Sequence, residues 1–164
     1  MKKISIFLTL ILALGGSAYA QTTPADTSVT SAAQGSFPAG ATYNGVPLSG
    51  LEIGAGSVIF GDGSGADGVL GIRLLGLSTG LTPQQVINID AQVTGGSRTA
   101  ATAAMISGTC SIDMGNGLPP VTGVPFTATI ATDSNSLGAV TLVLSGTQLP
   151  AATIGDGSMT VADQ

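Results

Sequence analysis

The chain has 164 residues, of which 43% are apolar and only 8% charged, with one cysteine and neither histidine nor tryptophan. The lack of histidine excludes Ser–His and Cys–His catalytic pairs and histidine-based zinc or copper sites, so we expect no enzyme. Once the two N-terminal lysines are set aside, two arginines stand against nine acidic residues, and the net charge of −7 excludes a nucleic-acid partner.

Residues 1–20 have the pattern of an export signal. Lys2 and Lys3 precede an apolar run over residues 4–14, and residues 18–20, Ala-Tyr-Ala, form a small-x-small cleavage site. The run is shorter than the ~20 residues that span a bilayer, and the rest of the chain lacks a polybasic patch. We therefore expect a bacterial protein that is secreted or periplasmic, with no stable membrane insertion.

Residues 21–40 are rich in Thr, Ser, Ala, Gly and Pro, and their only large apolar residues are Val29 and Phe37. Such a segment buries too little surface to offset the entropy lost on ordering. The composition therefore predicts a flexible leader over residues 21–40, followed by one domain over residues 41–164.

The domain alternates between apolar and polar residues, most clearly over residues 86–94, where Ile87, Ile89 and Val93 share one face. Turn signals separate such segments about every ten residues, which predicts an all-β fold. We expect an antiparallel β-sandwich of about seven to nine short strands, with a small β-barrel as the alternative. Further strands are predicted over residues 51–53, 58–60, 69–77, 97–105, 124–130 and 139–145, with a closing hairpin over residues 153–161.

Cys110 is the only cysteine, so the chain cannot form an internal disulfide. It lies in an alternating stretch, residues 106–114, that is apolar at every second position. This pattern predicts a buried thiol that acts as a small apolar side chain. Intermolecular pairing or a reactive thiol are the alternatives.

Residues 61–68, Gly-Asp-Gly-Ser-Gly-Ala-Asp-Gly, are the most suggestive segment. Their glycines match a dinucleotide-binding fingerprint, but a strand pattern follows where that site needs a helix. The simplest interpretation is a hairpin tip, where Gly and Asp supply positive φ. The alternative is a calcium loop with Asp62 and Asp67 as ligands, and no other cofactor is expected.

The order of strands and turns resembles a secreted bacterial β-sandwich module of the post-choice-of-anchor type. This resemblance implies an extracellular setting and carries no catalytic residues. The segments that carry it are residues 60–63, 72–75, 86–93, 95–100, 106–112, 125–130 and 151–161.

These observations predict an exported, non-catalytic protein with a structural or adhesive role at the cell envelope or outside the cell. The alternative is a calcium-dependent module that binds a ligand or a glycan through Asp62 and Asp67. Because the chain lacks the lysines that commonly protect exposed strands, we also expect self-association through sheet edges.

Overall fold

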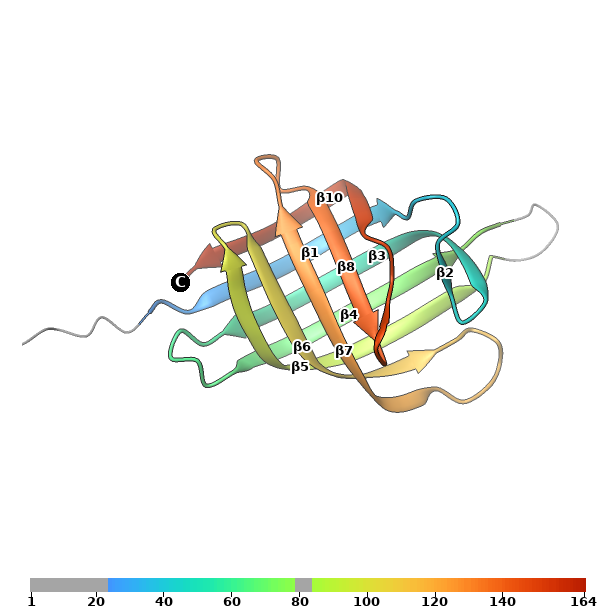
Figure 1. Ribbon diagram of the computed structural model, residues 1–164, viewed down its shortest axis with the longest axis horizontal. Coiled ribbons are helices and arrows are strands. Elements are labelled where there is room, and N and C mark those ends of the chain that lie inside the picture. Colours follow the sequence, from blue (N-terminus) through green and yellow to red (C-terminus); the bar gives the residue numbers. More distant parts are fainter. Residues whose placement is uncertain (1–23, 79–83) are drawn as a thin grey trace, which may run out of the picture.

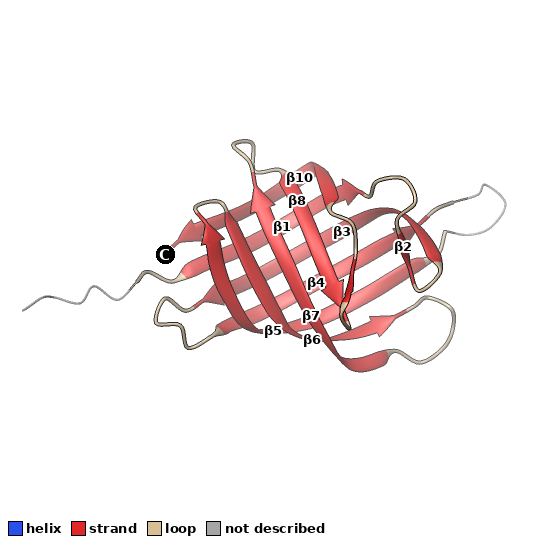
Figure 2. Ribbon diagram, in the orientation of Figure 1, coloured by secondary structure: helices blue, strands red, loops and turns tan. Residues whose placement is uncertain are grey.

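The computed structural model describes residues 24–78 and 84–164, and every regular element in them is a β-strand (Figure 2). In this part of the chain no helix is long and apolar enough to cross a membrane. The ten strands are β1 (Thr27–Ser36), β2 (Thr42–Tyr43), β3 (Val46–Ile59), β4 (Ala66–Gly76), β5 (Val86–Ala100), β6 (Ala103–Asp113), β7 (Val121–Thr132), β8 (Gly138–Leu144), β9 (Thr147–Gln148) and β10 (Ala152–Asp163).

All strand pairs are antiparallel, and the eight long strands close into a barrel. The hydrogen-bonded order runs from β1 through β10, β8, β7, β6, β5 and β4 to β3, and β3 pairs with β1 again. The short strands β2 and β9 pair with β3 and β8. The prediction of an all-β antiparallel fold is confirmed, whereas the sandwich is wrong and the alternative, a small β-barrel, fits.

The N-terminal strand decides between these two architectures. Over Thr27–Ser36 the prediction of a flexible leader is wrong, because β1 pairs along its whole length with both neighbours, with β3 in one register and with β10 with a single shift. Amino-acid composition underestimates the tendency of this segment to form a strand. The neighbouring strands β3 and β10 satisfy its backbone hydrogen-bonding groups, and small side chains are sufficient at this place in the barrel wall. Val29 is completely buried and Ala33 nearly so. The predicted export signal lies outside the described residues.

The barrel is flattened into two layers that cross steeply (Figure 1). Strands β10, β1, β3 and β4 form the more distant layer, β7 and β8 form the nearer one, and β5 and β6 bend from one layer into the other. Register shifts accompany these bends, at Val93/Gly95 in β5 and at Cys110/Ile112 in β6. Such bulges let one strand contribute to two layers, which explains why a barrel and a sandwich share the same sequence pattern.

Apolar side chains fill the barrel interior. The predicted inward faces are confirmed for Ile87, Ile89 and Val93 in β5, and Cys110 is buried with 4% of its surface exposed. A side chain at Gly108 would overlap the Gln92 carbonyl oxygen, so neighbouring backbones approach closely at this point. The largest fully buried side chains are Leu51, Leu70, Leu74, Ile87, Ile89, Ile106, Ile130, Leu142, Leu144, Leu149, Met159 and Val29.

Two local predictions need correction. The predicted closing hairpin over residues 153–161 is a single strand, because β10 runs on through the glycine-rich stretch, and the extra residue Gly155 is taken up by a register shift opposite Gln34 and Gly35. The predicted strand over residues 97–105 is divided by a tight turn, since β5 ends at Ala100 and β6 begins at Ala103. The positions of glycine and alanine in the sequence do not by themselves show whether the chain forms a β-bulge or a turn.

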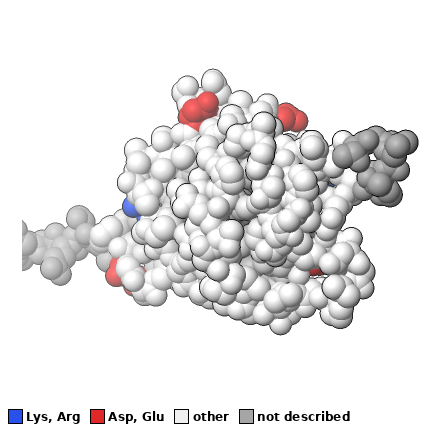
Figure 3. Space-filling model, turned by 45° about the vertical axis from the view of Figure 1, so that its right-hand side comes forward, with Lys and Arg blue, Asp and Glu red and all other residues white. Residues whose placement is uncertain are grey.

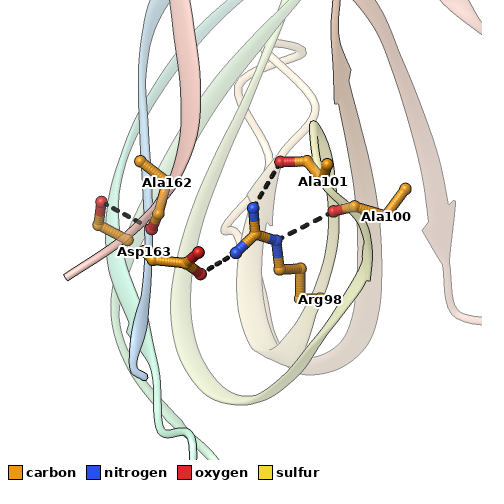
Figure 4. A network of polar contacts seen from close by, with 6 residues as sticks. Arg98, Ala100, Ala101, Ala162 and Asp163 are labelled. Carbon is orange, nitrogen blue, oxygen red and sulfur yellow. Dashed lines mark hydrogen bonds and ion pairs between the residues drawn. The ribbon is translucent and has the colours of Figure 1, made fainter. Parts of the chain in front are cut away.

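Arg98 links this turn to the end of β10 (Figure 4). Its guanidinium forms an ion pair with the Asp163 carboxylate and donates to the carbonyl oxygens of Ala100, at 3.1 Å, and Ala101, at 2.7 Å. These contacts tie the turn between β5 and β6 to the last residues of β10, at the barrel end that holds the C-terminus. Strand β2 lies at the opposite end (Figure 1).

Candidate functional site

The glycine-rich segment over residues 61–68 forms the tip of the β3–β4 hairpin and the start of β4. The Phe60 amide donates to the Gly65 carbonyl oxygen at 2.9 Å, and the Gly63 amide donates to the Phe60 carbonyl oxygen at 3.1 Å. Gly63 and Gly65 have φ values of +77° and +133°, which side chains disfavour. The hairpin tip is confirmed, but glycines alone supply the positive φ there, and neither Asp62 nor Asp67 does so.

The structure places Asp62 and Asp67 in different surroundings. The Asp62 carboxylate accepts a hydrogen bond from the Ser64 amide at 2.8 Å. Hydrogen bonds from the Ser64 hydroxyl and amide hold the pKa of Asp62 below its usual value. Asp67 lies on β4, where Gln92 donates to its carboxylate at 3.4 Å. Asp62 instead shares a hollow of about 300 Å³ with Asp26, whose carboxylate accepts the Gly61 amide.

Calcium binding through Asp62 and Asp67 therefore stays a prediction. Calcium takes six to eight oxygen ligands, more than two carboxylates supply. Within residues 24–78 and 84–164, no group of three or more His, Cys, Asp or Glu side chains is placed to hold a metal ion.

A large hollow lies on the outer wall of the distant layer, and we call it the outer groove. It has a volume of about 710 Å³ and crosses β10, β1, β3, β4 and β5. Gly54 and Gly71 lie side by side in its floor, and a Cβ atom at either would meet nothing closer than 3.9 Å. Paired glycines thus create the hollow by omitting two side chains. The groove is lined by Ala32, Ala33, Gln34, Glu52, Ile53, Gly54, Gly71, Ile72, Arg73, Asn88, Asp90, Asp156 and Gly157.

One edge of the outer groove is a row of long polar side chains on four adjacent strands. Gln34 pairs with Glu52, Glu52 with Arg73, and Arg73 with Asn88, so these four residues form a row that we call the polar row. Because neighbouring strands lie about 4.8 Å apart, the polar row offers hydrogen-bonding groups at a regular spacing along roughly 15 Å.

The polar row is close to neutral, and the groove around it is acidic. Arg73 Nη1 lies 2.6 Å from Glu52 Oε2, with 54% and 33% of the two side chains exposed, so this ion pair remains open to solvent. Asp90 and Asp156 add two negative charges to the lining. Neither the Gln34 nor the Asn88 side-chain amide forms a hydrogen bond with another described residue, so both amides can bind a ligand. This arrangement disfavours anions and suits a neutral polar ligand.

The face formed by β7 and β8 has a different character, since neither strand contains a charged residue. In the view of Figure 3, the middle of the surface displays no charged atoms. The polar row is thus a local feature of one wall. Sequence analysis missed it, because its four residues lie on different strands and only the register brings them together.

Comparisons of this chain with protein-family models, curated proteins and solved structures give no match. The resemblance to the post-choice-of-anchor module stays a prediction.

Proposed function

We propose that this protein is an exported, non-catalytic barrel with an adhesive role at the cell envelope or outside the cell, and that it attaches through the outer groove. The observation that carries the proposal is the polar row, in which Gln34, Glu52, Arg73 and Asn88 stand in register along an open hollow. A linear, hydroxyl-rich polymer such as a neutral polysaccharide matches this repeated spacing.

Charge and chemistry support this ligand class. Among the described residues that line the groove, Arg73 is the one cation, and it is already paired with Glu52, so a phosphate or sulfate would meet mainly carboxylates. Asn, Gln, Asp, Glu and Arg side chains donate to and accept from hydroxyl groups. The described residues that line the groove include no aromatic side chain, so each contact is weak, and we expect a dissociation constant of about 1 mM for one copy. Many copies on one surface would raise the overall affinity.

A non-catalytic role agrees with the available side chains. Cys110, the one thiol, is buried, and burial raises its pKa, which makes it a poor nucleophile. Because β-strands hold the polar row in a fixed register, the site is suited to holding a ligand.

Affinity electrophoresis through gels that contain a neutral polysaccharide tests the proposal, with dextran, laminarin and galactomannan as probes. We expect at least one polymer to retard the protein. Gly71→Phe fills the groove floor and abolishes retardation, whereas Gly56→Phe makes the same change on β3 outside the groove and preserves it. A Cβ atom at Gly56 has nothing within 4 Å, so this control is sterically mild.

A second pair of variants removes one cation each. Arg73→Ala breaks the polar row and is expected to abolish retardation, while Arg98→Ala changes the protein charge equally and leaves it intact. If none of the three polymers retards the protein, or if both members of each pair behave alike, the outer groove is not the attachment site.

A further inference from the structure

A second hollow lies at the barrel end that carries β2, and we call it the mouth pocket. It has a volume of about 310 Å³ and sits between the β2–β3 turn, the start of β7 and the turn from β8 to β9. The mouths of β-barrels are common places for small-molecule sites, and such sites range from about 300 to 1,000 Å³. This pocket is separate from the outer groove and shares no residue with it.

The walls of the mouth pocket are apolar. Ile112 and Leu144 are almost completely buried and form part of the barrel core, with 4% and 1% of their surfaces exposed. Met114 and Val124 pack against that core and are partly exposed. Val121, at the start of β7, has 59% of its surface exposed. An apolar molecule in the pocket would therefore cover apolar surface that now faces water.

A few polar groups stand among these apolar walls. They are the Tyr43 phenol, the Asn44 amide and the hydroxyl groups of Ser145 and Thr147. The Asn44 amide donates to the Met114 sulfur over 4.0 Å, and a thioether is a weak acceptor that a ligand oxygen can replace. Asn44 and Ser145 have φ values of +47° and +50°, so tight turns fix both residues at the pocket.

The Tyr43 phenol is neutral and available as a donor or an acceptor. Burial raises the pKa of Tyr43 and the nearby Cys110 thiol adds to this rise, while a hydrogen bond with Asn44 acts in the opposite direction. No Asp, Glu, Lys or Arg side chain is among the described residues that line the pocket. A charged ligand would lose its hydration here without gaining a partner of opposite charge.

We infer that the mouth pocket binds a small, neutral, mainly apolar molecule that carries one hydrogen-bonding group, such as an alcohol or a phenol. Its volume corresponds to about ten water molecules at roughly 30 Å³ each, which leaves room for about eight to ten non-hydrogen atoms. The apolar part lies against Ile112, Val124 and Leu144, and the hydroxyl group reaches Tyr43 or Asn44. This site does not depend on the proposed attachment through the outer groove.

Titration of the full chain with p-cresol, followed by amide NMR, tests the inference. We expect saturable shifts at Asn44, Ser145 and Thr147, and at least tenfold weaker binding of benzoate, which has a similar size and a negative charge. Tyr43→Phe is expected to weaken p-cresol three- to tenfold and to leave toluene unchanged, because only p-cresol uses a hydroxyl group.

Pocket-filling variants complete the test. Val121→Trp is expected to weaken p-cresol at least tenfold, whereas Leu118→Trp, at an exposed residue of the preceding loop that does not line the pocket, changes it less than twofold. Thr147→Trp fills the pocket from β9 and serves if Val121→Trp does not fold. Shifts away from the pocket, equal binding of benzoate, or unchanged binding by a folded pocket-filling variant would overturn the inference.

Discussion

Replacing Val29 by alanine tests whether β1 is an integral part of the barrel. Val29 is 0% exposed and is the only large apolar side chain that β1 buries in the interior. Removing two buried methyl groups costs about 1.6 kcal/mol at ~0.8 kcal/mol each. The cavity left behind adds about 1 kcal/mol when its walls relax only in part. We therefore expect a loss of about 2–3 kcal/mol in the free energy of unfolding.

Val69→Ala is the matched control, because Val69 lies on the outer wall in β4 with 60% of its surface exposed. The same chemical change there is expected to cost less than about 0.5 kcal/mol. Urea unfolding monitored by far-ultraviolet circular dichroism measures both effects. With a slope near 2 kcal/mol per molar urea, the midpoint falls by about 1–1.5 M for Val29→Ala and by less than ~0.3 M for Val69→Ala.

Equal midpoints for the two variants would refute the place of β1 in the wall. A flexible leader would give this result, since its side chains remain in water in both the folded and the unfolded state. A lower slope for Val29→Ala alone would indicate a less cooperative unfolding transition, and the two-state comparison would then need hydrogen exchange.

Three further outcomes are expected. Ser57→Ala raises the urea midpoint or leaves it unchanged, because the Ser57 hydroxyl is buried with no hydrogen-bond partner among the described residues. A lower urea midpoint would indicate that a bound water forms a hydrogen bond with this hydroxyl. Gly108→Ala costs at least about 1–3 kcal/mol, since its methyl group would overlap the Gln92 carbonyl oxygen, whereas Gly56→Ala is neutral or stabilising by thermal unfolding. Burial raises the pKa of Cys110 above its unfolded value of about 9.0, so the contribution of this thiol to the free energy of unfolding is complete below pH 9 and declines at higher pH. Urea midpoints measured between pH 7 and 10.5 therefore decline less for Cys110→Ala than for the unmodified protein. An identical decline in the variant would contradict a buried Cys110 thiol with a raised pKa.

Calorimetry with calcium decides the remaining prediction for the hairpin tip. Heat that disappears in the Asp62→Ala, Asp67→Ala double variant would support a calcium loop. No heat, or the same heat in that variant, removes the calcium hypothesis for these two residues.

Closure of the barrel also changes the expectation of self-association. Most long strands have partners on both sides over most of their length, but among the described strands β10 pairs with β8 over residues 152–154 alone, which leaves one side of its remaining residues without a strand partner. The order of strands also leaves β2 as its free end, and β9 pairs with β8. Self-association through sheet edges stays a prediction, but most of the strand edges that would be free in an open sheet are paired within the barrel. Light scattering after size exclusion at high concentration measures the oligomeric state, and a strictly monomeric profile would count against association.

The class of fold and much of the interior follow from local patterns in the amino-acid sequence. Alternation places Ile87 and Ile89 on the buried face whichever strand they pair with, because side chains in a strand point to opposite sides in turn. The hairpin tip over residues 61–68 was predictable for a similar reason, since only glycine readily adopts the φ values found at Gly63 and Gly65. These are local properties of the chain.

Closure of the sheet and the alignment of its polar residues depend on contacts between strands that are distant in sequence. Strand β1 looks disordered by composition, and it becomes ordered because β3 and β10 satisfy its backbone on both sides. Gln34, Glu52, Arg73 and Asn88 are separated by up to 54 positions, and the pairing register alone aligns them. Register is a non-local quantity, set by bulges and by closure, so alternation can predict which face a residue occupies but cannot predict its neighbour on the next strand.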